Sequence, residues 1–128
     1  MGEKRYILFL DDRPERAALF SNRLSGEDRA RTIWARTATE AIEALLELGD
    51  YSFDSIHLDH DLGGVQYQDS RSEESGMEVV RWMEKNGTPS KNTKIIIHSW
   101  NLPASRRMVE RLTDAGYKVQ QVPFGMGK

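Results

Sequence analysis

Residues 56–64 read Ile-His-Leu-Asp-His-Asp-Leu-Gly-Gly, and this stretch decides the fold. Apolar residues lead in from Phe53, and then three ionisable side chains arrive together, followed by two glycines. A buried charge is costly unless it is paired or binds a metal, and glycine lets the backbone turn sharply beside a ligand. The stretch therefore predicts a buried strand over 53–58 that ends in a functional loop. The alternative is an ordinary acidic turn that caps the next element.

Two other strand-like runs end in related chemistry. The apolar run 6–10 is followed by Asp11 and Asp12, and the β-branched run 94–97 is followed by His98-Ser99-Trp100-Asn101. Short continuous apolar runs are typical of strands that are covered on both faces, as in a parallel sheet. Because three runs share this ending, the functional interpretation is favoured over the acidic turn.

Amphipathic stretches alternate with these runs. Apolar residues at helical spacing predict four helices: from Pro14 to a stop at Gly26, over 37–49, over 76–85 and over 102–116. Two further strands are predicted over 31–36 and 117–122. Alternating strands and helices predict an α/β fold with a parallel sheet. At 128 residues we expect one domain, 1–128, a flavodoxin-like three-layer sandwich with strand order 2-1-3-4-5 that lacks a final helix.

In that strand order the carboxyl ends of the first, third and fourth strands meet at one crevice. Carboxylate oxygens suit Mg²⁺ or Mn²⁺, while two imidazoles nearby leave Zn²⁺ as an alternative. The metal-ligand candidates are Asp11, Asp12, Asp59 and Asp61. We predict that this divalent cation is the cofactor.

Other side chains at the crevice suit catalysis and phosphate binding. His60 and His98 are candidates for an acid–base pair that flanks the substrate, because imidazole titrates near neutral pH; His57 is expected to point away from the site. Ser99 and Asn101 are candidates for hydrogen bonds to phosphate. Three further candidates have structural alternatives: Arg13 and Arg16 contact phosphate or form surface ion pairs, and Trp100 stacks on a base or covers the end of the sheet.

Composition bounds the partners. The net charge of −2 does not indicate a basic surface for binding long nucleic acid. The absence of cysteine is typical of proteins of the reducing cytoplasm. No apolar run approaches the roughly 20 residues of a membrane span. The polar segment 62–75 is either a lid or a solvated loop. Without a final helix, apolar surface around Val119 and Phe124 favours a homodimer.

The sequence resembles response-regulator receiver domains. The resemblance rests on the acidic pair Asp11-Asp12, on Asp59 and on the hydroxyl of Ser99. In that family the acids hold a divalent metal and the third aspartate accepts a phosphoryl group. The sequence departs from the family where receivers place a lysine after the fifth strand, because the chain reads Val-Pro-Phe over 122–124. The departure argues against phospho-relay signalling.

A closer resemblance is to the cyclic-phosphate processing receiver domains. It is carried by Leu10-Asp11-Asp12, by 58–63, by 97–101, by Met108 and by 122–124. It implies a metal-dependent phosphodiesterase, with Asp59 also catalytic, that acts on a small cyclic-phosphate or nucleotide ligand such as a cyclic nucleotide signal or a 2′,3′-cyclic phosphate end. The alternative is a non-catalytic receiver-like module that binds or sequesters a phosphate ligand or a protein partner.

Overall fold

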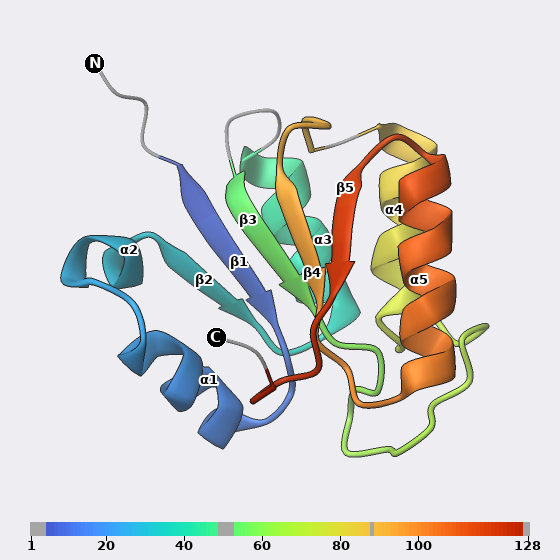
Figure 1. Ribbon diagram of the computed structural model, residues 1–128, viewed down its shortest axis with the longest axis horizontal. Helices are drawn as coiled ribbons and strands as arrows, with labels where there is room; N and C mark the ends of the chain where they lie inside the picture. Colours follow the sequence, from blue (N-terminus) through green and yellow to red (C-terminus); the bar gives the residue numbers. More distant parts are fainter. Residues whose placement is uncertain (1–4, 49–52, 88, 127–128) are drawn as a thin grey trace.

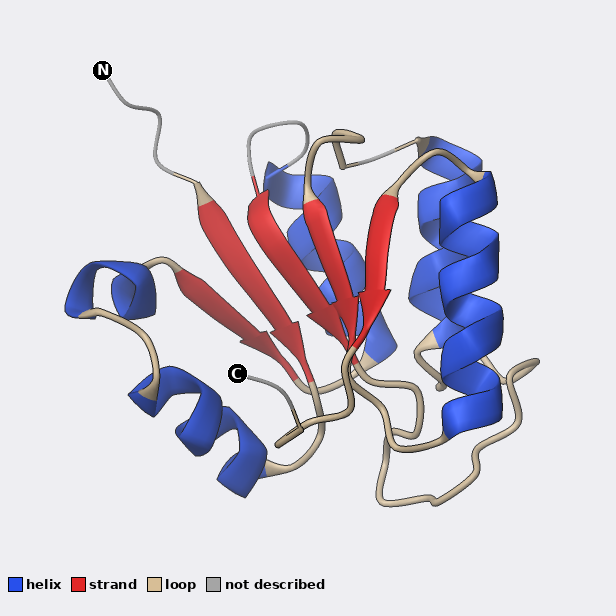
Figure 2. Ribbon diagram, in the orientation of Figure 1, coloured by secondary structure: helices blue, strands red, loops and turns tan. Residues whose placement is uncertain are grey.

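The computed structural model describes residues 5–48, 53–87 and 89–126, and it contains one parallel sheet. The strand order is β2-β1-β3-β4-β5, and each adjacent pair is parallel. The strands are β1 (Tyr6–Leu10), β2 (Thr32–Ala35), β3 (Phe53–Leu58), β4 (Lys94–Ile97) and β5 (Lys118–Gln121). Their carboxyl ends converge on one edge, where the connecting loops gather (Figure 2). The predicted fold class and strand order are confirmed.

Three helices cover one face of the sheet (Figure 1). They are α3 (Ala38–Leu48), α4 (Met77–Asn86) and α5 (Leu102–Asp114). Alternate strand residues point into the core beneath them, because side chains change face at every position of a strand. Leu8 and Leu10 of β1, Ile56 of β3 and Ile95 of β4 are fully buried there. This packed core holds the strand ends in fixed register.

The opposite face is only partly covered by the remaining helices, α1 (Pro14–Asn22) and α2 (Gly26–Ala30). The prediction of one helix that stops at Gly26 was wrong, since Gly26 begins α2. The Ser25 hydroxyl caps this second helix by accepting a hydrogen bond from the backbone N–H of Asp28 at 3.1 Å. No residue of α1 is fully buried. Its Phe20 stacks on Phe9 of β1, with ring centroids 4.3 Å apart.

The chain beyond β5 leaves part of this face open. Residues 122–126, the last that the structure describes, contain no helix, as the sequence predicted. A groove of about 270 Å³ lies beside β4 and β5, and its apolar lining comes from Phe9, Phe20, Ile96, Val122 and Phe124. Within the described parts of the chain, each helix is too short or too polar to cross a membrane.

Candidate functional site

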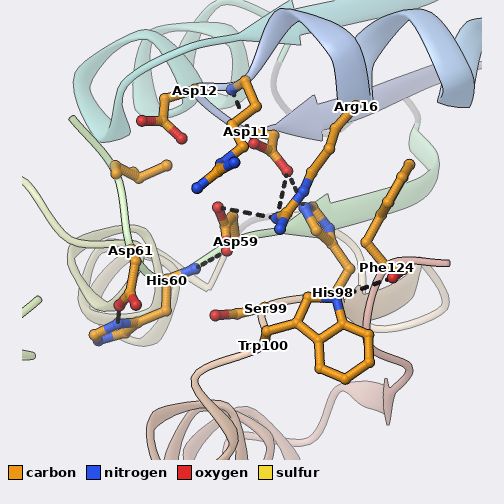
Figure 3. Close-up of polar contacts among 12 residues, drawn as sticks. Asp11, Asp12, Arg16, Asp59, His60, Asp61, His98, Ser99, Trp100 and Phe124 are labelled. Carbon is orange, nitrogen blue, oxygen red and sulfur yellow. Dashed lines mark hydrogen bonds and ion pairs between the residues drawn. The ribbon is translucent and has the colours of Figure 1, made fainter. Parts of the chain in front are cut away.

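Three strand ends meet at the carboxyl edge of the sheet, as the sequence predicted (Figure 3). Asp11 follows β1, Asp59 follows β3 and His98 follows β4. The parallel hydrogen-bond ladder continues into these positions, because the N–H of Asp59 donates to Leu10 O at 3.1 Å and the N–H of His98 donates to Leu58 O at 3.0 Å. One ligand atom from each of Asp11, Asp59 and His98 lies within 4.8 Å of the other two. All three residues are buried.

His98 is oriented by Asp11 and by aromatic rings. Its Nε2 lies 2.9 Å from Asp11 Oδ2, while its buried Nδ1 has no hydrogen-bond partner among the described residues. These partners assign the ring proton to Nε2, which donates to the carboxylate. The imidazole stacks on Phe9 at 4.9 Å between centroids, and Phe124 meets it edge-on at 5.9 Å. The histidine is therefore rigidly held behind the carboxylate.

Arg16 supplies positive charge between the two buried carboxylates (Figure 3). Its Nη1 lies 3.4 Å from Asp11 Oδ2 and 4.0 Å from Asp59 Oδ2. Burial raises the pKa of Asp11, but the hydrogen bond from His98, together with Arg13 N–H and Arg16, outweighs burial and leaves this pKa below its ordinary value. Burial raises the pKa of Asp59 to about 6, against the opposing effect of His98. The two neighbouring carboxyl groups thus differ in acidity.

A cleft of about 100 Å³ opens above these groups. Most of the side chains predicted for the site line it: Asp12, Arg13, Arg16, Asp59, Asp61, Ser99, Trp100 and Asn101. Asp11, His60 and His98 do not belong to this lining. His57 lines the groove on the open face of the sheet, as His98 also does, and it does not line the cleft. The cleft therefore combines carboxylates with cationic and neutral hydrogen-bonding groups.

Asp12 is directed at a loop rather than at the buried group. Its Oδ2 accepts a hydrogen bond from the backbone N–H of Gly64 at 2.6 Å. This bond joins the segment after β1 to the segment after β3. Gly64 has φ +77°, a left-handed conformation that glycine adopts without steric cost. Asp12 thus lines the cleft while Asp11, its neighbour, lies beneath it.

The predicted pairing of His60 and His98 around one substrate does not match this geometry. His60 is fully buried, and both of its nitrogens have partners: Nδ1 lies 2.7 Å from Asp61 Oδ1 and Nε2 lies 2.8 Å from Ser70 Oγ. These partners assign the proton to Nδ1 and make Nε2 the acceptor of the Ser70 hydroxyl. The ring lies under the 62–75 loop, where Ser70 supplies one of its two hydrogen bonds. His60 holds the loop in place.

Asp61 organises the same loop. Its carboxylate accepts hydrogen bonds from the backbone N–H groups of Tyr67 at 2.6 Å and Gln68 at 3.1 Å, and from Asn101 Nδ2 at 3.0 Å. Burial raises the pKa of Asp61, but the hydrogen bonds from His60, Asn101 and these N–H groups outweigh burial and lower it. Asp61 lies outside the group of Asp11, Asp59 and His98. Its four donors already satisfy most of its capacity as an acceptor.

Sequence reasoning missed the residues that fix this loop. Arg81 of α4 donates to the carbonyl oxygens of Ser70 at 2.7 Å and Ser72 at 3.0 Å, and Arg107 of α5 donates to Ser70 Oγ at 3.0 Å. Gln68 Oε1 accepts from Leu62 N–H at 2.9 Å. Polar residues in a long loop give no local signal of such partners, since the arginines lie far along the chain. The loop is fixed by side chains rather than freely solvated.

Gly76 is a further residue whose role sequence reasoning missed. It precedes α4, and its N–H donates to His60 O at 2.8 Å. A Cβ atom here would lie 1.8 Å from Asp59 O and 2.9 Å from His60 Cα. Such distances are not sterically allowed, so the close approach of α4 to the segment after β3 requires glycine. A glycine directly before a helix was the available signal, but the chain alone does not show what it contacts.

The segment after β4 is fixed by the start of α5. Asn101 caps this helix, with Oδ1 accepting from Ala104 N–H at 3.3 Å, and Ser99 Oγ accepts from Asn101 N–H at 3.1 Å. Trp100 is partly exposed, and its Nε1–H donates to Phe124 O at 3.0 Å. The predicted substrate-binding residues of this segment are therefore brought to the cleft in fixed positions.

This arrangement, with acids after β1 and β3 and His98 and Ser99 after β4, agrees with the comparison with protein families. The family described as "Cyclic-phosphate processing Receiver domain" matches this chain over residues 6–114. The chain belongs to this family. The match includes every strand end that contributes to the cleft, and so it covers the whole candidate site of this cyclic-phosphate processing receiver domain. The comparison with curated proteins found no match.

Solved receiver domains share the fold. The signal receiver domain of a putative LuxO repressor protein from Vibrio parahaemolyticus is 17% identical with a TM-score of 0.64, over 98% of this chain and 82% of the other. The non-phosphorylated HemR receiver domain from Leptospira biflexa is 21% identical with a TM-score of 0.65, over 97% and 85%. The CheX–CheY–BeF3–Mg²⁺ complex from Borrelia burgdorferi is 15% identical with a TM-score of 0.62, over 95% of this chain and 79% of the other. At these identities the likeness establishes the fold.

Proposed function

We propose that this receiver domain is a metal-dependent hydrolase of cyclic phosphates, such as cyclic nucleotide signals or 2′,3′-cyclic phosphate ends. The observation that carries the proposal is the buried group of Asp11, Asp59 and His98, whose ligand atoms lie within 4.8 Å of one another beside a cleft that also contains arginines. Carboxylates favour a divalent cation, and arginines favour a phosphate. The two kinds of group meet at one place.

The residues present fit a divalent metal ion. Burial and the neighbouring charge of Asp11 both raise the pKa of Asp59, so a cation here would relieve the cost of ionising it. Asp11 and Asp59 would hold the ion, His98 would orient Asp11 through the hydrogen bond from Nε2, and Asp12 lies at the cleft above them. Carboxylate oxygens suit Mg²⁺ or Mn²⁺. When bound, such an ion polarises a phosphoryl oxygen.

The residues of the cleft have separable roles in the proposed reaction. Arg13 and Arg16 bind the phosphate oxygens, and Ser99 orients the phosphate by hydrogen bonding. Hydrolysis forms one P–O bond to water and breaks one ester P–O bond. Asp59 accepts the proton that water loses, and this proton then passes to the leaving oxygen. The pKa of Asp59 is about 6 in the metal-free protein; a bound cation would lower this pKa, so the carboxylate would be ionised and able to accept the proton.

The histidines act behind carboxylates in this scheme. His98 donates to Asp11, and His60 contacts Asp61. We therefore assign His60 and His98 as positioning residues and keep Asp59 as the catalytic residue. This assignment replaces an acid–base pair of histidines, because neither imidazole lines the cleft.

A binding module is the second candidate function. The observation that favours it is the same absence of both imidazoles from the lining of the cleft, since phosphate binding needs only the arginines and the hydroxyl. In this alternative the domain sequesters a phosphate ligand or presents it to a protein partner. The binding groups are shared, so the two functions differ in turnover rather than in affinity.

A turnover assay separates the two functions. We would incubate the protein with cyclic mono-, di- and oligonucleotides and Mg²⁺, Mn²⁺ or Zn²⁺, and measure linear products by chromatography. If the protein is a hydrolase, the wild type should form linear products and Asp59→Asn should form none. Arg16→Ala should bind the ligand more weakly, and Glu43→Gln, a substitution on an exposed helix surface, should leave turnover unchanged. Tight binding with intact ligand under every metal would reject the hydrolase and establish the binding module.

We also propose self-association through the open face of the sheet. The 270 Å³ groove beside β4 and β5 is lined by the half-buried rings of Phe20 and Phe124 and also by the charged side chains of Arg23 and Lys94. Val119, which was expected to contribute to this surface, packs against the core instead. Covering apolar surface of this kind with a second surface lowers the free energy and therefore favours association. The groove lies on the face opposite α3, α4 and α5, so a second copy would dock away from the packed core.

A further inference from the structure

The cleft is too small for the whole ligand that the proposed function requires. Its volume is about 100 Å³, whereas sites that enclose an entire small organic ligand measure roughly 300–1,000 Å³. A phosphate group with a metal ion fills a space of this size. If the proposed function holds, the remainder of the ligand must lie over the rim of the cleft. The chemistry of the rim then decides which ligand is recognised.

The rim carries two exposed aromatic rings from different loops. Tyr67, in the loop after β3, is 74% exposed, and Trp100, in the loop after β4, is 47% exposed. Both residues line the cleft. Single exposed aromatics are ordinary on protein surfaces. Here both line the same phosphate-sized cleft and are exposed, so each ring is available to a ligand that extends beyond the cleft.

Both aromatic residues are anchored although they are exposed. Trp100 Nε1–H donates to Phe124 O at 3.0 Å. Tyr67 has φ +53°, a left-handed conformation that is unfavourable for a bulky residue. Asp61 compensates, because its two carboxylate oxygens accept the N–H groups of Tyr67 at 2.6 Å and Gln68 at 3.1 Å. Strain that is maintained by surrounding contacts concentrates at binding sites. The Tyr67 backbone is thus ordered by the same carboxylate that lines the cleft.

We propose that the ligand is a nucleotide whose base stacks on Trp100 and Tyr67 while its cyclic phosphate enters the cleft. Stacking on aromatic rings tolerates different bases because every base presents a flat π face. The larger surface of a purine gives the larger gain. This inference rests on the proposed function, and it names the class of substrate: a nucleotide rather than a cyclic phosphate without a base.

Two probes and matched variants test the proposal. The probes are adenosine 2′,3′-cyclic monophosphate and 1-O-methylribose 2,3-cyclic phosphate, which lacks the base, each titrated by calorimetry with Mn²⁺ present. Trp100→Ala removes one ring. Tyr67→Asn removes the other but keeps a residue that tolerates the left-handed conformation, and Tyr67→Phe keeps the ring. Leu46→Ala, at an exposed apolar residue of α3, is the control.

The expected result is that the adenosine probe binds the wild type about ten-fold or more tightly than the abasic probe. Trp100→Ala and Tyr67→Asn should each remove most of this difference, while Tyr67→Phe and Leu46→Ala retain it. Equal affinity of the wild type for both probes would overturn base stacking and leave the proposed function standing. Variants that weaken both probes equally would show a structural role instead. If neither probe binds the wild type, this inference is overturned, while the proposed function is decided separately by the turnover assay on the wider panel of cyclic nucleotides.

Discussion

The imidazole Nε2 of His98 lies 2.9 Å from Oδ2 of Asp11, and this contact links the ends of β4 and β1 across the intervening strand β3. Both side chains are buried, with exposed fractions of 3% and 0%. A hydrogen bond to a buried charged group contributes more than one to a neutral group. The pair therefore contributes both to the stability of the sheet edge and to the arrangement of the site.

His98→Ala should lower the free energy of unfolding by roughly 2–4 kcal/mol, because it leaves the buried Asp11 carboxylate without this donor and opens a cavity beside Phe9. Urea unfolding followed by circular dichroism measures the change. His57→Ala is the matched control, since His57 also packs against Phe9 on the same face of the sheet, but its Nε2 lies 3.0 Å from the hydroxyl of nearby Ser55 rather than beside a buried carboxylate. Equal losses in the two variants would contradict a special contribution from the Asp11 contact.

The stability of the metal-free protein should depend on the ionisation of Asp59. Its folded-state pKa of about 6 exceeds the ordinary 3.8, so its protonated form favours the folded state. This contribution, on the order of 3 kcal/mol, is complete below pH 3.8 and is lost as pH rises through about 6. Asp11 and Asp61 act in the opposite direction at more acidic pH, because their pKa values are lowered.

Urea unfolding of the wild type and Asp59→Asn in chelator, between pH 4 and 7, isolates this contribution. The variant should gain stability relative to the wild type as pH rises, because its amide does not ionise. A constant difference between the two proteins across this range would reject a raised pKa for Asp59.

A divalent cation should stabilise the fold by mass action. At a concentration about 100 times its Kd, a metal ion that binds only the folded state contributes about 2.7 kcal/mol, which raises the Tm of a domain of this size by several degrees. Thermal unfolding with Mg²⁺, Mn²⁺ and Zn²⁺ measures the shift. Asp59→Asn and Asp12→Asn should each reduce it. If the Tm responds to none of the three ions, the site is not a metal site.

Gly76→Ala should destabilise the fold severely and displace Asp59. The added Cβ would lie 1.8 Å from Asp59 O, so α4 or the segment after β3 must move. Gly26→Ala is the control, since nothing lies within 4 Å of a Cβ at that position. Thermal unfolding should show a loss of at least roughly 3 kcal/mol for the first variant and little change for the second. A tolerated Gly76→Ala would mean that the backbones approach less closely than the structure shows.

Self-association should be detectable and should depend on the open face of the sheet. Light scattering at increasing concentration is expected to reveal a dimer, because burial of the groove beside β4 and β5 removes apolar surface from water and stabilises the dimer. Phe20→Ser, on the rim of the groove, should shift the equilibrium toward monomer, whereas Leu46→Ser on α3 should not. A monomer at high concentration would reject the dimer.

The sequence alone determined the sheet and the positions of its functional ends. Apolar runs, helical spacing and the acids after 6–10 and 53–58 are local patterns, and strand order follows from general rules of α/β connection. The meeting of the segments after 6–10, 53–58 and 94–97 could therefore be predicted, whereas the expected cluster of Asp12, Asp59 and His98 is formed by Asp11 in place of Asp12. The second helix was missed because Gly26 reads as a stop, although Ser25 before it is a capping residue.

Only the tertiary structure decided which partners these side chains take. His60 and His98 are both histidines at strand ends, yet one turns under a loop to Ser70 and the other turns inward to Asp11. Each choice depends on groups at least ten residues away in the chain, because a buried imidazole turns toward the hydrogen-bond partners that the surrounding segments provide. The requirement for Gly76 has the same origin, since it comes from the backbone of Asp59 packed against it. Local sequence specifies the elements, whereas contacts between distant segments orient the side chains of the site.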